Sequence, residues 1–132
     1  MRKKKTITIL TILAFIVICS VSYWYVNFPA YEKLAEERID TYMAVQDVDK
    51  NKVTKKHSQK NYEQGRWTID YAFDEKDVEY QYEYDKSQDR VLLFIRYNGI
   101  PVEIIKKEVK YQGLNKNGYW TAFDENGNIL LK

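Results

Sequence analysis

Cysteine, histidine, proline and glycine are all scarce in this chain of 132 residues, which has one cysteine, one histidine, two prolines and five glycines. A disulfide needs two cysteines, and a zinc site needs several histidine, cysteine or carboxylate ligands. We therefore expect no disulfide, no metal site and no other cofactor. The few glycines are scattered, which also excludes a glycine-rich loop of the kind that cradles phosphates.

The residues that catalysis requires are not grouped in the sequence. His57 is the single histidine and lies in the polar run Lys55-Lys56-His57-Ser58. Neighbouring side chains on a strand point to opposite faces, so His57 is badly placed to activate Ser58. Carboxylates fall in predicted turns and on the solvent side of a predicted strand: Asp74, Glu75, Asp77, Glu79, Glu83 and Asp85. We expect no catalytic residue and a protein that is not an enzyme.

What the chain does have is a long uncharged run, Ile7 to Val26, directly behind Arg2-Lys3-Lys4-Lys5. As a helix, a run of about 20 residues is about 30 Å long, which matches the hydrocarbon core of a bilayer. The basic residues in front predict a cytoplasmic N-terminus. The aromatic cluster Tyr23-Trp24-Tyr25 suits the opposite membrane interface.

These features predict a single-pass protein of the cell membrane with the lipid bilayer as a partner. The expected parts are a cytoplasmic basic stub over 1–6, a transmembrane helix over 7–27 that acts as a signal anchor, and an extracytoplasmic domain over 28–132. A cleaved signal peptide is an alternative, because Ser20-Val21-Ser22 has the small-x-small form of a cleavage site. Lipidation of Cys19 is a weaker alternative, since the bulky Ile18 precedes it.

Charge divides unevenly along the chain. Four of the 21 basic residues precede the apolar run, which leaves 17 basic against 19 acidic residues after it. A slightly acidic domain does not favour nucleic acid as a partner. The remaining candidate for a partner is another envelope or membrane protein.

The pattern after the apolar run predicts an α+β domain. Ala30 to Val45 repeats apolar residues at spacings of three and four, as an amphipathic helix does. Apolar and polar residues alternate over Arg66–Phe73 and Val78–Asp85, which predicts two strands, and the apolar Arg90–Tyr97 predicts a more central third. Val53–Asn61 fits an edge strand or a loop. The expected fold is the amphipathic helix packed on an antiparallel meander of three to five strands.

The C-terminal part is harder to interpret. Asn98-Gly99 and Asn117-Gly118 are turn signals, and Asn-Gly between apolar runs is typical of a hairpin. Val102 to Tyr111 fits a helix or an irregular strand, and we favour the strand. A last apolar run is Ile129-Leu130-Leu131.

An excess of tyrosine, twelve residues, provides the one candidate binding surface. Aromatic rings on one face of two neighbouring strands could grip a glycan or an extended peptide. The alternative is that these rings form the core beneath the helix. The five residues concerned are Trp67, Tyr71, Tyr80, Tyr82 and Tyr84.

The order of these elements resembles the domain-of-unknown-function family 3139 of small Firmicutes membrane proteins. The likeness rests on the basic N-terminus, the apolar span, the segment TYMAVQDVDKNKV and the pair GRWTIDYAF and VEYQYEYDK, and it covers roughly Met1 to Tyr97. It implies a bacterial membrane protein of unknown activity, with no functional residues to carry over. The helix and meander also look like small peptidase-associated inhibitory domains, by analogy of fold alone.

The function that we expect is therefore a membrane-tethered extracytoplasmic module that binds or regulates another component of the bacterial cell envelope. Alternatives are an envelope enzyme inhibitor, an enzyme, or a cleaved and secreted form of the same domain.

Overall fold

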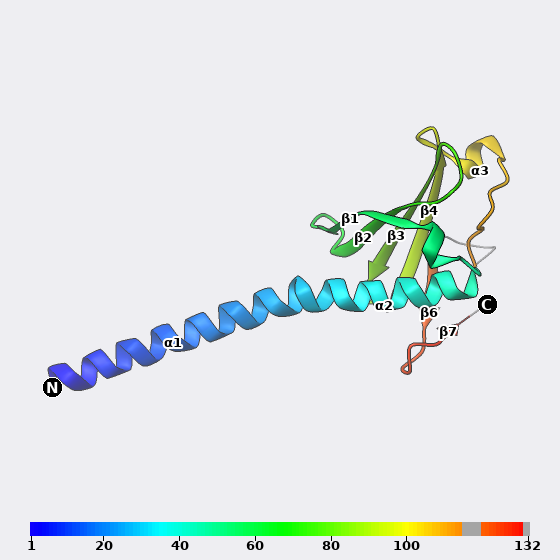
Figure 1. Ribbon diagram of the computed structural model, residues 1–132. Helices are drawn as coiled ribbons and strands as arrows, with labels where there is room; N and C mark the ends of the chain where they lie inside the picture. Colours follow the sequence, from blue (N-terminus) through cyan, green and yellow to red (C-terminus); the bar gives the residue numbers. More distant parts are fainter. Residues whose placement is uncertain (115–119, 131–132) are drawn as a thin grey trace. The chain divides into compact units, whose positions relative to one another are not determined.

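The computed structural model describes residues 1–114 and 120–130 of the chain. Internal contacts divide it into two compact units, Met1–Tyr31 and Glu32–Lys132. Figure 1 shows the order of the elements along the chain. The predicted Asn117-Gly118 turn and Leu131 lie outside the described residues.

Helix α1, Arg2–Asn27, makes up most of the first unit and has no buried residue. Its hydroxyl side chains bond within the helix: Thr8, Thr11 and Ser20 each donate to the carbonyl oxygen four residues earlier, at 2.9, 2.9 and 2.8 Å. Hydroxyls bonded in this way tolerate an apolar environment. By length and composition the helix could cross a membrane, either as a signal anchor or as part of a signal sequence.

Helix α2, Pro29–Val45, confirms the predicted amphipathic helix to within one residue. Proline is tolerated in a first turn because its missing N–H has no intrahelical partner there. The helix ends near Asp47, whose φ is 61°, and a 3₁₀ turn, η1 at Lys50–Lys52, leads into the sheet. Four apolar residues of the helix in the second unit are buried: Ala35, Ile39, Tyr42 and Met43.

Within residues 32–114 and 120–130, the second unit contains an antiparallel sheet of seven strands. The four long strands run as a meander: β1 Thr54–Asn61, β2 Arg66–Ala72, β3 Val78–Asp85 and β4 Arg90–Tyr97. The three short strands follow: β5 Ile100–Pro101, β6 Trp120–Phe123 and β7 Ile129–Leu130. The α+β class and the antiparallel sheet are confirmed, but the expected three to five strands were too few. Two of the short strands have only two residues, which is too short to show an alternating pattern.

Strand β4 organises the C-terminal part, because both β5 and β6 pair with it. The turn between β4 and β5 is the predicted Asn98-Gly99, with φ of 50° and 80°, which a tight hairpin of this type requires. The favoured strand over Val102–Tyr111 is wrong. A short helix, α3 at Val102–Ile105, takes its place and ends at Lys106, whose φ is 51°.

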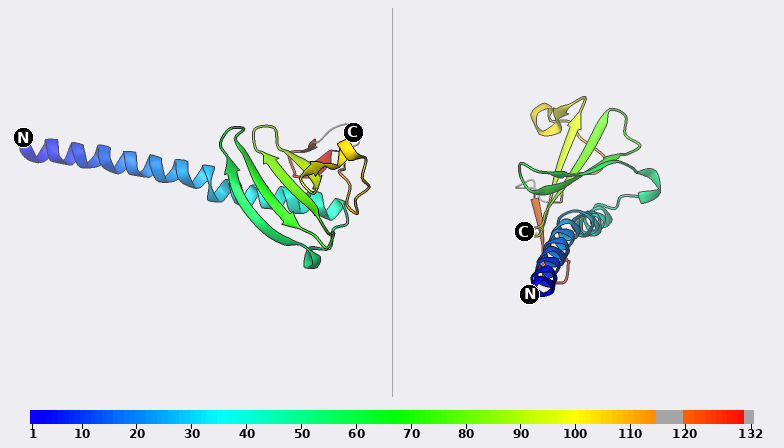
Figure 2. Two further views of the ribbon diagram at one scale, coloured as in Figure 1. Left: turned by 90° about the horizontal axis from the view of Figure 1, so that it is seen from above. Right: turned by 90° about the vertical axis from the view of Figure 1, so that its left-hand side faces the viewer.

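Helix α2 lies along one face of the twisted sheet (Figures 1 and 2). The rings of Tyr42 on α2 and Tyr82 on β3 meet edge to face, with centroids 5.8 Å apart. Register places the cross-strand neighbours of Tyr82, which are Ile69 on β2 and Leu93 on β4, on this same inner face. The core therefore lies between α2 and the inner face of β2 to β4.

Strand β1 forms one edge of the sheet and confirms the edge-strand alternative for this segment. Its pairing with β2 shifts between Lys55 and His57, so that Lys56 has no partner residue and forms a β-bulge. Lys55 pairs with Glu36 on α2. The edge is thus basic and irregular.

Candidate functional site

The five residues of the predicted aromatic surface lie in or beside the core. The exposed fraction is 4% for Trp67, 0% for Tyr80 and Tyr82, and 1% for Tyr84, while Tyr71 is half-buried. Tyr71 and Tyr82 pack edge to face at 5.6 Å. In this arrangement the four buried rings form part of the core, as the alternative prediction has it.

The hydroxyl groups of these tyrosines reach polar partners at the rim of the core. Tyr82 donates to Gln46 at 2.8 Å, and Tyr80 donates to Glu75. Burial raises the pKa of both phenols, and the bond to Glu75 raises that of Tyr80 further. The rings are therefore held in the neutral form, as hydrogen-bond donors.

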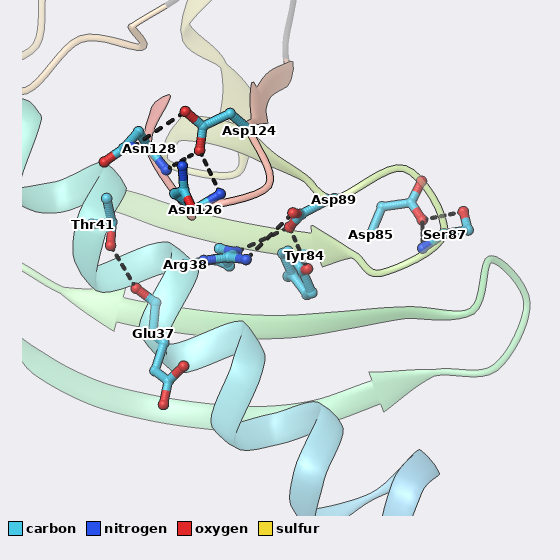
Figure 3. A network of polar contacts seen from close by, with 10 residues as sticks. All are labelled: Glu37, Arg38, Thr41, Tyr84, Asp85, Ser87, Asp89, Asp124, Asn126 and Asn128. Carbon is cyan, nitrogen blue, oxygen red and sulfur yellow. Dashed lines mark hydrogen bonds and ion pairs between the residues drawn. The ribbon is translucent and has the colours of Figure 1, made fainter. Parts of the chain in front are cut away.

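Arg38 on α2 is the centre of a polar network that joins three parts of the domain (Figure 3). Its guanidinium forms two hydrogen bonds to Asp89 in the β3–β4 turn, at 3.0 and 3.4 Å. Tyr84 donates to the same carboxylate at 2.6 Å. Burial alone would lower the pKa of Arg38, but the bonds to Asp89 outweigh it and the pKa is raised. The ion pair fixes the helix against the turn.

The third part of this network is the β6–β7 turn. Asp124 accepts the backbone N–H groups of Asn126 and Asn128, both at 2.9 Å (Figure 3), and the bonds from Asn128 make the largest contribution to lowering its pKa. Gly127 in this turn has a φ of 80°, and a Cβ atom there would lie 2.1 Å from Nη1 of Arg38. The guanidinium therefore packs directly against the glycine backbone.

A Gly127→Ala substitution is expected to lower the free energy of unfolding by about 2–3 kcal/mol, because it strains a positive φ and displaces Arg38 from Asp89. Gly99→Ala is the matched control, since Gly99 has the same φ of 80° but no atom within 4 Å of the added Cβ. It should cost only the backbone strain, about 1 kcal/mol. Urea unfolding of both variants measures the difference. Equal losses would show that Arg38 does not depend on Gly127.

The outer face of the sheet, opposite α2, has paired charges. Arg66 on β2 contacts Glu83 on β3 at 2.9 Å, and Arg90 contacts Asp85 at 3.2 Å. Only 6% of Glu83 and 8% of Asp85 is exposed, so the expectation that these two acids are solvated is wrong. Burial would raise the pKa of Asp85, but hydrogen bonds from Ser87 and Arg90 lower it overall. Each of these two carboxylates is thus both buried and paired with an arginine.

In the described part of the chain, no group of three or more histidine, cysteine or carboxylate residues is placed to hold a metal ion. His57 is exposed and faces Asp70 across the β1–β2 pair. Burial raises the pKa of Asp70, and the charge of His57 opposes this rise. Ser58 accepts a hydrogen bond from the indole of Trp67 at 2.8 Å, which places it on the other face of β1.

One further arrangement was not anticipated from the sequence. The segment Lys110–Leu114, which we call the strap, crosses one end of the core. Its backbone N–H groups donate to core or rim side chains: Lys110 to Glu75 at 3.1 Å, and Leu114 to the hydroxyl of Tyr42 at 2.9 Å. Tyr111 packs its ring edge to face on Phe73 at 5.2 Å. A single apolar residue, Tyr111, between polar neighbours was the one signal of this contact.

Comparison with known proteins adds one match. Residues 2–84, which span α1 to most of β3, match the model of the family described as "Protein of unknown function (DUF3139)". No curated protein and no solved structure matches the chain. The resemblance expected from the sequence is confirmed, and the chain belongs to the DUF3139 family.

Proposed function

We propose that this protein is a membrane-anchored module whose α+β domain lies outside the cytoplasm and binds or regulates another component of the bacterial cell envelope. In this proposal α1 is retained as a signal anchor and the bilayer covers it. The domain acts by contact with a partner and has no catalytic role.

The observation that carries the proposal is the exposure of α1. Its large apolar side chains have exposed fractions such as 67% for Phe15, 60% for Leu10 and 63% for Ile18. Soluble proteins rarely expose so large a continuous apolar surface, because water penalises it. Helix α1 has its four basic residues at its start and an uncharged run behind them, which is the form that lipid accepts and orients.

Two features support a role in binding. The buried carboxylates Glu83 and Asp85 are neutralised by arginines, which leaves them poorly suited to acid–base work. Helix α2 packs on one face of the sheet, so that the outer face presents Arg90 and Trp120 to a partner, with the guanidinium 5.7 Å from the ring centroid. Aromatic and arginine side chains are enriched in protein interfaces.

Membrane attachment is tested by fractionation and by the mass of the mature protein. We expect the protein to sediment with membranes, to resist extraction with alkaline carbonate and to be released by detergent, with the intact mass of 15.8 kDa. Cleavage after Ser22 would remove the first 22 residues and release the domain from the membrane. A soluble, shortened product would overturn the anchor and favour the secreted alternative.

The binding role is tested by crosslinking and affinity capture from membranes. The intact protein is compared with a version that lacks residues 1–27 but is exported by a cleavable signal. We expect both to capture the same partner, because the sheet domain makes the contact. If only the membrane-bound form captures a partner, the contact lies in α1 and the domain is not the binding module.

A further inference from the structure

The strap, Lys110–Leu114, is held to the rest of the domain in the manner of a bound peptide. Its N–H groups reach side-chain oxygens of Glu75, Tyr80 and Tyr42. Its carbonyl at Gln112 accepts a hydrogen bond from Gln46 at 2.9 Å. In the described part of the chain these backbone bonds end on side chains, whereas each sheet strand bonds to the backbone of its neighbour.

The side chains of the strap divide into anchors and exposed positions. Tyr111 is 9% exposed and packs on Phe73 and Tyr80, with ring centroids 5.2 and 6.3 Å away. Leu114, three residues later, is half-buried, whereas Lys110 and Gln112 are exposed. Extended peptides are recognised in this way, with main-chain hydrogen bonds for affinity and a few buried side chains for specificity.

The surface beneath the strap is preorganised by the core. We call it the aromatic end, made up of Tyr42, Phe73 and Tyr80 with the polar Gln46 and Glu75. The ring of Phe73 stacks on that of Tyr80 at 4.1 Å. Gln46 is fixed because its amide also accepts the hydroxyl of Tyr82. These groups are positioned by α2 and the β2–β3 hairpin, so they stay in place when the strap leaves.

We infer that the strap is an internal occupant of a peptide-binding site at the aromatic end. The partner that it excludes is an extended segment of another protein with an aromatic residue followed, three positions later, by an aliphatic one. Such a segment reproduces Tyr111 and Leu114 and offers its N–H groups to the same oxygens. The inference rests on the proposed binding role and names the chemistry of the partner.

Opening of the strap is expected to cost less than unfolding of the sheet. Segments that are held by few backbone-to-side-chain bonds open locally, with a smaller free energy than central strands. An internal occupant lowers the apparent affinity for an external peptide, because the site can accept that peptide only during the fraction of time in which the strap is open. The strap therefore acts as an autoinhibitory contact that a partner must displace.

The test uses the full-length protein in detergent and a fluorescent synthetic peptide with the sequence of residues 108–114, EVKYQGL. Tyr111→Ala removes the anchor of the internal strap but leaves the aromatic end intact. We expect this variant to bind the peptide at least about 10-fold more tightly than the unaltered protein does. A peptide with serine in place of the tyrosine should not bind.

Gln112→Ala is the matched control in the strap. Its side chain is exposed and its bond to Gln46 is made by the backbone carbonyl, so the substitution should leave peptide affinity unchanged. A folded Tyr111→Ala variant that binds the peptide no better than the unaltered protein would overturn the inference.

Hydrogen exchange of the unaltered protein provides a second measurement that needs no variant. We expect the amides of Tyr111 and Leu114 to exchange about 100-fold faster than those of Ile69 and Tyr82 in the central strands. Equal rates would show that the strap opens only when the domain unfolds, and would overturn the inference even if Tyr111→Ala does not fold. Both experiments are independent of membrane attachment, so their failure is distinguishable from failure of the anchor or of partner capture.

Discussion

Replacing Tyr82 with alanine is expected to lower the free energy of unfolding of the sheet domain by about 3–5 kcal/mol, as for other large-to-small changes at aromatic core positions. The side chain is 0% exposed and its ring contacts those of Tyr42 and Tyr71. Its loss leaves a cavity at the centre of the core and removes the hydroxyl partner of Gln46. A domain of this size has a total stability near the low end of about 5–15 kcal/mol, so much of the variant should be unfolded.

Urea unfolding followed by circular dichroism, with the protein in mild detergent, measures this loss. Tyr82→Phe keeps the ring and removes only the hydrogen bond to Gln46, so it should cost about 1 kcal/mol. Tyr62, which is 75% exposed in the β1–β2 turn, provides a surface control whose change to alanine should stay within about 0.5 kcal/mol. If Tyr82→Ala were as mild as the surface control, the ring would not be a core element.

Alkaline pH is expected to unfold the domain cooperatively. Burial raises the pKa of Tyr80, Tyr82 and Tyr84 above the ordinary value of about 10. These tyrosines keep their protons to a higher pH in the folded state than in the unfolded state. The folded state therefore keeps its full stability below a pH of about 10 and loses it as the pH rises further towards the folded-state pKa. Each pH unit above 10 costs about 1.4 kcal/mol per tyrosine, or about 4 kcal/mol for all three.

Circular dichroism and the near-ultraviolet absorbance of tyrosinate test this expectation in one titration. Loss of structure and ionisation of the core tyrosines should coincide in a sharp transition between pH of about 11 and 12, where the accumulated cost reaches the stability of a small domain. Return to neutral pH should restore the fold. Ionisation of the whole set while the circular dichroism stays native would mean that the phenols are accessible to water.

The elements with regular periodicity could be predicted from the sequence because their burial follows local rules. Alternation over Arg66–Ala72 and Val78–Asp85 identified two strands, and turn chemistry identified the bend at Asn98-Gly99. The spacing of Ile39 and Met43 identified the buried side of α2. In each case the signal lies within a few residues of the element that it describes.

The remaining features depend on contacts between distant parts of the chain. The pair Arg38–Asp89 joins residues 51 positions apart, and the strap bond from Tyr111 to Tyr80 spans 31. A charged residue on a helix or in a turn gives no local sign of its partner. Alternation also shows that Tyr82 and Glu83 face opposite sides, but not that Arg66 covers the carboxylate. The sequence alone therefore could not separate a solvated acid from a buried, paired one.

In the membrane-anchored form that we propose, the irregular edge strand β1 affects how densely copies of the domain can lie side by side. Proteins that share one bilayer diffuse in two dimensions, so their domains collide far more often than at the same abundance in bulk solution. A straight, uncharged edge would then template the growth of one continuous sheet from molecule to molecule. The bulge at Lys56 breaks the spacing that such growth needs, and the lysines at 55, 56 and 60 repel a second copy of the same edge. Strand β1 is therefore poorly suited to edge-to-edge pairing between copies of the domain, and this property would protect the membrane-anchored form that we propose against polymerisation.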